Sequence, residues 1–380
     1  MNLFRTTTEV HSQPAQLHQR WEAYVSDQYK LSALCLLALL WLSHSLFLAD
    51  RVSTPSYLSV LLFLMPLAVL HGVCLFLSRR AEGGSTLTAL LPRFLGRGME
   101  CLIGLSLLCD AVFLLCGLAS LLGEMLPALR RYMIVPLIGA FCFLSMLRNK
   151  HFALLRLSGF LFLPLLIGIF LSAAPALKEG HFHHFFPLLG SGPASIGKGA
   201  LWLCGNLGCA CLPLLIPGEK ESLSRMRQKG KRRGGGFLFL LSLYALLVIA
   251  MYTYLLPPYA LTEQLSMGER LLLPVQISSS VPGWSLYVCS LILLLLVCYT
   301  GLISRSAAFL HGSCTKEDHP SDLLILVLIL LSLPCAFFYA HDVQDYLVLL
   351  LPYRALPYLA ALTLASIGAL IKAGKRRKTA

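Results

Sequence analysis

Long apolar runs alternate along the chain with short polar segments. Because a helix needs about 20 mostly apolar residues to cross a bilayer, the pattern predicts ten transmembrane helices. We place them at roughly 31–49, 57–78, 99–122, 132–147, 157–175, 196–216, 237–256, 284–304, 322–340 and 349–372. The fourth run is short and the tenth contains Arg354, so these two are the least typical spans. The expected fold is an all-α polytopic membrane protein with a single transmembrane domain over residues 31–372.

Composition agrees with this pattern. The chain has 380 residues, of which 57% are hydrophobic and 13% are charged, whereas a soluble domain usually carries about 25% charged residues. The formal net charge of +13 comes from basic residues that gather at the ends of the apolar runs. Such clusters set membrane orientation and attract anionic lipid, so we expect a lipid bilayer and no nucleic acid as partner.

A basic tract orients the predicted spans. Residues 217–233 carry seven Lys or Arg and two Glu, and basic loops stay on the cytoplasmic side of a membrane. The other even-numbered connections are also richer in Lys and Arg than the odd ones, except for Arg130 and Arg131. We therefore expect an integral membrane protein with both termini cytoplasmic: an uncleaved N-terminal segment over 1–30 and a basic tail over 373–380.

The number of predicted spans suggests an internal repeat. Ten spans divide into five plus five, and an odd number per half gives the halves opposite orientations in the membrane. This is the topology of an inverted-repeat transporter of the leucine-transporter type. Repeat one would cover about 31–175 and repeat two about 196–372. The halves show no similarity of sequence, so this step rests on the span count.

The sixth predicted span carries residues that interrupt helices. Gly205, Asn206 and Gly208 lie near its middle, and Pro213 follows. Gly frees the backbone, and Pro removes a hydrogen-bond donor. In inverted-repeat transporters the first helix of each repeat is broken at the ligand site, so these residues predict an unwound stretch beside a binding site. Close helix packing through small residues is the alternative.

Other candidate ligand-binding residues lie in the first, sixth and eighth spans. Ser43, His44 and Ser45 form a polar triplet in the first span, either lining the same site or solvated near the outer interface. Trp202 and Tyr299 would supply further walls of the site. Together with free N–H groups at a helix interruption, these residues suit a small zwitterion such as an amino acid.

Asp110 is the sharpest single residue of the sequence. It lies inside the third span, where burying an isolated carboxylate is costly. We expect it to face the bundle interior. There it would bind a ligand amine, carry a proton or pair with His71; a protonated carboxyl satisfied by a neighbouring helix is the alternative.

Enzyme and metal chemistry find little support in the sequence. There is no nucleotide-binding, serine-hydrolase or zinc-protease motif, so we expect neither an enzyme nor a cofactor. His181, His183 and His184 fit no standard metal-site spacing, and we interpret them as part of an interfacial aromatic segment. The 13 cysteines lie mostly inside apolar runs, where cysteine acts as a small packing residue.

Residues 184–217, HFFPLLGSGPASIGKGALWLCGNLGCACLPLLIP, resemble the spore germination permease family, the B subunits of nutrient germinant receptors. The match lies in Phe186–Gly190, in Gly192 and Pro193, and in Lys198 and Gly199. That family is similar to the amino acid–polyamine–organocation transporters. The chain departs from the family in its first span, where Ser43, His44 and Ser45 replace a break made of small residues.

The resemblance implies a sensor for a small nutrient, often an amino acid. Such a sensor would act with an A subunit and a lipoprotein C subunit in the cell membrane or inner spore membrane. Two other functions remain open: a proton-coupled amino acid permease, and a structural membrane partner with a degenerate site.

Overall fold

A computed structural model describes a large part of the chain, and every helix or turn below belongs to that part. The described residues are 29–43, 56–80, 92–126, 131–146, 151–173, 181–182, 192–209, 240–248, 272, 281–314, 322–339 and 351–379. Their regular structure is entirely helical, which agrees with the all-α prediction.

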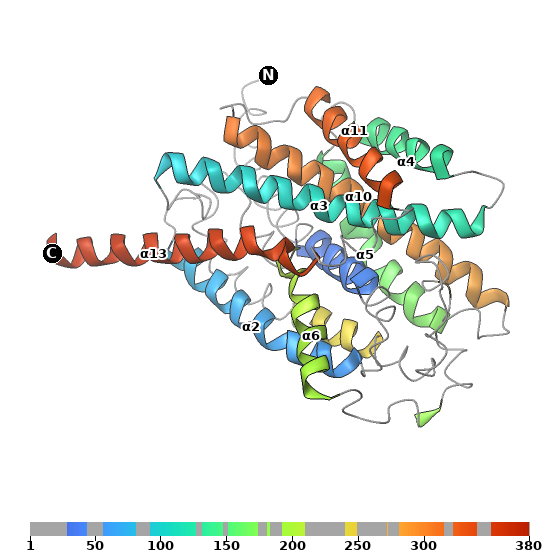
Figure 1. Ribbon diagram of the computed structural model, residues 1–380, viewed down its shortest axis with the longest axis horizontal. Helices are drawn as coiled ribbons and strands as arrows, with labels where there is room; N and C mark the ends of the chain where they lie inside the picture. Colours follow the sequence, from blue (N-terminus) through green and yellow to red (C-terminus); the bar gives the residue numbers. More distant parts are fainter. Residues whose placement is uncertain are drawn as a thin grey trace, which may run out of the picture.

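The labelled helices are α2 (Ser56–Arg80), α3 (Arg93–Met125), α4 (Arg131–Met146), α5 (His151–Ala173), α6 (Pro193–Cys204), α10 (Val281–Cys314), α11 (Asp322–Tyr339), the 3-10 helix η5 (Leu351–Ala355) and α13 (Leu356–Thr379) (Figure 1). A helix over Tyr29–Ser43 precedes them, and residues 207–209 and 240–248 are also helical. Each of the ten predicted spans overlaps one of these segments.

Two of the described helices are long and apolar enough to cross a membrane, at Phe94–Met125 and Ser285–His311. Several shorter helices are strongly apolar, namely Tyr29–Ser43, Leu58–Leu70, Met133–Met146, Arg156–Leu171 and Asp322–Pro334. The count of ten spans, the orientation of the termini and the five-plus-five repeat stay predictions.

Two predicted boundaries differ from the structure for a common reason. We expected the third span to begin near residue 99 and the eighth to end near 304, but α3 begins at Arg93 and α10 continues to Cys314. An apolar window stops at a charged residue, whereas a helix does not need to. Arg305, which ends the apolar run, is buried within α10 with only 7% of its surface exposed.

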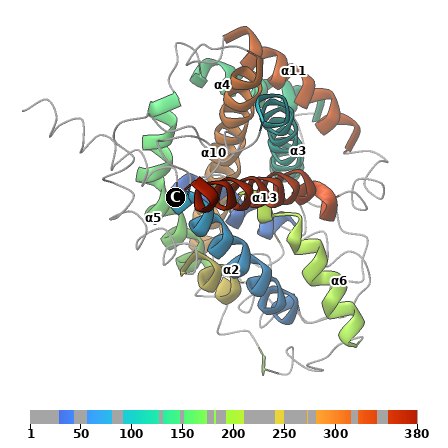
Figure 2. The ribbon, with the colours of Figure 1, turned by 90° about the vertical axis from the view of Figure 1, so that its left-hand side faces the viewer.

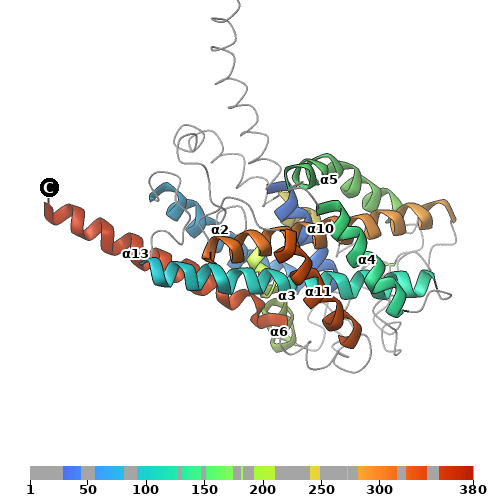
Figure 3. The same cartoon turned by 90° about the horizontal axis from the view of Figure 1, so that it is seen from above.

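Helices α3 and α10 run beside each other through the centre of the molecule (Figures 1 and 3). Their backbones approach closely at Gly104, whose position leaves room for the side chain of Leu310. The hydroxyl of Ser306 donates a hydrogen bond to the carbonyl oxygen of Gly104 at 2.7 Å. Small residues that let helices approach are typical of helix pairs in membranes.

The helix Tyr29–Ser43 forms the centre of the core. All its residues from Leu31 to Ser43 are buried, and a helix that is apolar all around is a buried one. Its first turn packs where Gly301 of α10 leaves space for Leu31, and its last turn packs where Gly117 of α3 leaves space for Leu42. The first helix of the described chain is therefore held between the two longest ones.

The outer helices present large apolar side chains on their surface. Leu137, Phe141 and Leu144 of α4 are exposed, as are Phe160 and Leu163 of α5. Several large apolar side chains exposed together on one helix are unusual in a soluble monomer. On a membrane protein they form the surface that lipid covers. Proline inside α2, α4, α5 and α11 is tolerated more readily in such helices.

The last helix departs from the predicted span. The tenth run was expected to form one helix over 349–372, but the chain forms the 3-10 helix η5 before α13 begins at Leu356. Two prolines explain the change. Pro352 lies inside η5, and Pro357 lies in the first turn of α13, where a missing N–H costs nothing. α13 passes between α3 and the pair α2 and α6 (Figures 1 and 2) and continues through most of the basic tail.

Candidate functional site

The helix interruption predicted in the sixth span is present. Helix α6 ends at Cys204, Gly205 and Asn206 form a turn, and residues 207–209 are helical again. At the turn the backbone N–H of Asn206 donates to the carbonyl oxygen of Leu203 at 3.0 Å, a spacing of three residues instead of four. Irregular backbone at membrane depth is tolerated where protein buries it or where it lines a cavity; here Gly205 and Asn206 are buried.

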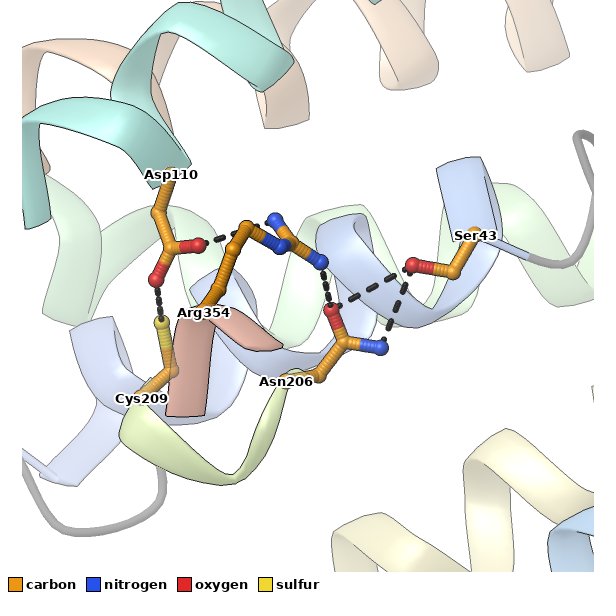
Figure 4. Close-up of polar contacts among 5 residues, drawn as sticks. All are labelled: Ser43, Asp110, Asn206, Cys209 and Arg354. Carbon is orange, nitrogen blue, oxygen red and sulfur yellow. Dashed lines mark hydrogen bonds and ion pairs between the residues drawn. The ribbon is translucent and has the colours of Figure 1, made fainter. Parts of the chain in front are cut away.

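A buried ion pair stands beside this interruption. The Nη1 atom of Arg354 lies 2.8 Å from Oδ1 of Asp110, and Figure 4 shows the two side chains pointing toward each other. The carboxylate of Asp110 is fully buried, and the side chain of Arg354 is only 7% exposed. The prediction that Asp110 faces the bundle interior is thus confirmed. Its partner is an arginine; the side chain of His71, the partner considered from sequence, lies outside the described residues.

The guanidinium of Arg354 also reaches the turn after α6. Its Nη2 atom donates a hydrogen bond to Oδ1 of Asn206 at 2.8 Å. The Asn206 amide in turn meets the hydroxyl of Ser43, through Nδ2 at 3.2 Å and through Oδ1 at 3.3 Å (Figure 4). One arginine therefore links a carboxylate on α3 to an amide on the interrupted helix and, through it, to the helix Tyr29–Ser43.

An aromatic ring fixes the guanidinium from one side. The Cζ atom of Arg354 lies 4.7 Å from the centroid of the Phe113 ring, within the range of a cation–π contact. Phe113 follows Asp110 by three residues on α3, so both side chains lie on one face of that helix. Helix α3 thus supplies both the opposite charge and the stacking surface for Arg354.

Cys209 is a further contact of Asp110. Its thiol points at Oδ2 of Asp110 at 3.8 Å, and its carbonyl oxygen accepts a hydrogen bond from the hydroxyl of Ser32. The short helix 207–209 is therefore attached both to α3 and to the helix Tyr29–Ser43. We call Ser43, Asp110, Asn206, Cys209 and Arg354 the buried network, the set drawn in Figure 4.

Gly208 serves close packing. A Cβ atom at this position would clash with the ring of Tyr358, a fully buried residue of α13. The glycine lets that ring lie directly on the backbone of helix 207–209. The two interpretations of the small residues in the sixth span thus apply to different positions: Gly205 lies in the turn, and Gly208 provides room for a neighbouring helix.

The structure brings together only some of the residues that the sequence suggested. Ser43, Asp110 and Asn206 belong to the buried network, and Gly205 and Gly208 lie next to it along the chain. Tyr299 is engaged elsewhere, because its hydroxyl hydrogen-bonds Oγ of Ser332 on α11 at 2.8 Å. His44, Ser45 and the side chain of Trp202 lie outside the described residues.

Arg354, Phe113 and Cys209 were not predicted as site residues. A signal for Arg354 was present, since an arginine in a span is a functional candidate that needs a partner, and Asp110 was the obvious one. In the sequence, Arg354 made the tenth span atypical, and we did not pair it with Asp110. Phe113 and Cys209 carry no signal, because an aromatic ring or a cysteine inside an apolar run usually belongs to the core.

Within the described ranges, no group of three or more His, Cys, Asp or Glu side chains is placed to hold a metal ion. His181 is exposed, and His183 and His184 lie outside these ranges. Asp110 is the carboxylate of the buried network, and it faces a guanidinium. The network thus presents one buried carboxylate and one buried guanidinium at 2.8 Å from each other.

Comparisons with known proteins give a fold and no family. No family model matches the chain, and no curated protein does. Solved structures of the Eremococcus coleocola manganese transporter do match. Two of its mutants give a TM-score of 0.58 with 14% and 15% identity, covering 92% of this chain and 79% of theirs. Its complex with an aromatic bis-isothiourea substituted compound gives 0.57 with 11% identity.

This likeness shows that the chain has the fold of a membrane transporter. The all-helical architecture expected from the sequence agrees with this fold. At 14% identity the likeness extends to the fold alone. The spore germination permease family and the amino acid ligand stay predictions.

Proposed function

We propose that this chain recognises an amino acid at the interruption of α6, and that it does so as the membrane subunit of a spore germinant receptor. One observation carries the proposal. A buried arginine and a buried carboxylate meet at a broken helix in a protein with a transporter fold. Broken helices at mid-membrane are where transporter folds bind their ligands.

Stability alone is a weak reason for such a pair. Removing two charges from water is costly, and replacing a buried ion pair by apolar residues of similar volume is often neutral or stabilising. Most of the surrounding core is apolar, so an apolar substitute would have ample partners. Ionisable groups inside a membrane protein mark ligand and ion pathways by default, and the buried network adjoins the interruption of α6.

The cargo of the structural neighbour is not carried over. Manganese prefers oxygen ligands such as carboxylates, carbonyls and water, whereas the carboxylate of the buried network faces Arg354 at 2.8 Å. A divalent cation placed there would approach a guanidinium. The site fits an organic ligand that offers charges of both signs.

The receptor assignment rests on the resemblance of residues 184–217 to germinant receptor B subunits. In that setting the chain lies in the cell or inner spore membrane with both termini cytoplasmic. It assembles there with an A subunit and a lipoprotein C subunit. Nutrient binding changes the state of these subunits, and the nutrient is not transported across the membrane.

A proton-coupled amino acid permease is the second candidate. The transporter fold and the fully buried Asp110 favour it, because buried carboxylates carry protons in many transporters. The two candidates differ in turnover. Vesicles containing the permease would accumulate a labelled amino acid, and a protonophore would abolish the accumulation. A receptor subunit would bind the amino acid without accumulating it.

Binding to the purified full-length protein tests the proposal. Each of the twenty amino acids is titrated against the wild type, Asn206→Leu and the control Ser145→Ala, whose hydroxyl donates to the carbonyl of Cys142 within α4. We expect at least one amino acid to bind the wild type and the control, and Asn206→Leu to lose that binding. A stable protein that binds none would favour a structural membrane partner with a degenerate site.

A further inference from the structure

The contacts of Arg354 suggest what it does when a ligand is present, given the proposed function on which this inference rests. We infer that Arg354 is the residue that binds the ligand's carboxylate, and that the carboxylate of Asp110 pairs with Arg354 in the ligand-free protein. The ligand enters by exchange: its carboxylate replaces Asp110 on Arg354, and its ammonium group takes the released carboxylate of Asp110.

Geometry provides the first support. The guanidinium holds a carboxylate oxygen at 2.8 Å through Nη1 and an amide oxygen at 2.8 Å through Nη2, while Phe113 covers one face at 4.7 Å. An arginine held in a plane in this way is prepared to bind a carboxylate, because its fork of N–H donors matches two carboxylate oxygens. The carboxylate of Asp110 lies against this guanidinium, so a carboxylate group fits at that position.

The elements that carry the pair provide the second support. Arg354 lies on η5, a 3-10 segment, and Asn206 lies in the turn that ends α6. Both are places where the backbone departs from an α-helix. Segments of this kind absorb changes of backbone angle more readily than a helix interior. Asp110 lies in the middle of α3, a continuous helix of 33 residues. In the exchange, Asp110 therefore stays in place on a continuous helix, whereas Arg354 lies on a segment whose backbone can adjust.

Charge balance defines the class of ligand. The pair is neutral as a whole and buried, so a ligand with a single charge would leave one buried charge without a partner, which is strongly unfavourable. A zwitterion brings one charge of each sign and gives both residues a new partner. The site should therefore distinguish an amino acid from a simple carboxylate or a simple amine of similar size.

Removing the negative partner should reverse this preference. In Asp110→Asn the side chain keeps its size, but the carboxylate that competes for Arg354 is gone. A monocarboxylate then finds an uncompensated guanidinium. We expect propionate to bind Asp110→Asn about tenfold or more tightly than the wild type, and the amino acid to bind more weakly, because its ammonium has lost its partner.

The experiment uses the full-length protein in lipid nanodiscs. The probes are each of the twenty amino acids, propionate and ethylamine. The variants are Asp110→Asn, the double variant Asp110→Asn with Arg354→Gln, and Ser106→Ala. Ser106 is a matched control on α3: it is buried, and its hydroxyl donates to the carbonyl of Leu102 on the same helix. The double variant is neutral and keeps polar side chains, so it avoids an unpaired buried charge.

The inference predicts three results. Ser106→Ala behaves as the wild type; Asp110→Asn gains propionate binding; and the double variant loses that gain because the arginine is absent. If the amino acid that binds the wild type binds the folded double variant equally well, the assignment of Arg354 is overturned while nutrient recognition stands. If no amino acid binds the wild type, the proposed function fails, and propionate binding to the two variants still decides the role of Arg354.

Discussion

The contact between α3 and α10 and the buried network lie in the same molecule but are built on different principles. The first joins helices of 33 and 34 residues through apolar side chains, with Gly104 allowing close approach. The second joins a broken helix, a 3-10 segment and a carboxylate through one arginine. The first region consists of many small, nearly independent contributions, and the second of few contributions that depend on one another.

This difference sets how each region responds to substitution. Dispersion contacts are individually small, so a change at one position of the α3–α10 contact has a graded effect. A buried charge without its partner keeps its full desolvation cost. The buried network should therefore tolerate removal of both charges far better than removal of one.

The largest effect is expected for Arg354→Gln. The substitution leaves Asp110 fully buried with no opposite charge at 2.8 Å, and breaking a buried pair by removing one partner typically costs about 3–5 kcal/mol. Unfolding of the purified protein in detergent, followed by a fluorescence or circular dichroism signal, measures the loss. A destabilisation below about 1 kcal/mol would contradict a buried pair.

The double variant Asp110→Leu with Arg354→Met is the matched comparison. It removes both charges and fills the space with apolar side chains. We expect its unfolding free energy to lie close to that of the wild type, because apolar replacement of a buried pair is often neutral or stabilising. Additive losses from the two single substitutions would mean that the residues do not interact.

A smaller effect is expected in the α3–α10 contact. Gly104→Ala places a methyl group 2.8 Å from Cγ of Leu310, and overpacking of this kind costs about 1–3 kcal/mol. Gly98→Ala is the control on the same helix, since among the described residues a Cβ there would meet no atom within 4 Å apart from its chain neighbours and the nearby backbone of its own helix. There the substitution should stabilise the helix by up to about 1 kcal/mol. Equal effects at the two positions would show that α3 and α10 do not approach at Gly104.

The sequence predicted the apolar helices better than the buried network. All ten predicted spans overlap described helical segments, because the apolar pattern that marks a span also determines its packing. The interruption after Cys204 was predicted because Gly, Asn and Gly change the backbone locally. The pairing of Asp110 with Arg354 was missed, since the residues are separated by 244 positions and nothing local indicates which distant charge a residue meets.

The role of Tyr299 illustrates the same limit. Its place in an apolar run identified a hydroxyl at the right depth, but the direction of the side chain depends on the packing of α10 against its neighbours. The hydroxyl bonds Ser332 of α11, which itself donates to the carbonyl of Ile329 at 2.7 Å. The sequence predicted the correct helix for Tyr299 but not the face of that helix on which its side chain lies.

The smallest effect is expected for Tyr299→Phe. The substitution removes the hydrogen bond between the hydroxyls of Tyr299 and Ser332. Its loss should cost about 0.5–1.5 kcal/mol and leave amino acid binding unchanged, since the bond lies on the α11 side. Unfolding and binding measured on the same preparation check both statements, and a loss of binding would return Tyr299 to the candidate site.

An electron cryo-microscopy map of the ligand-free protein in lipid nanodiscs would show directly whether Arg354 joins Asp110 to Asn206. We expect the guanidinium of Arg354 to lie about 3 Å from the carboxylate of Asp110 and from the side-chain oxygen of Asn206, with α6 ending at Cys204. An unbroken helix through Gly205 and Asn206, with Arg354 extended toward the lipid headgroups, would contradict this expectation.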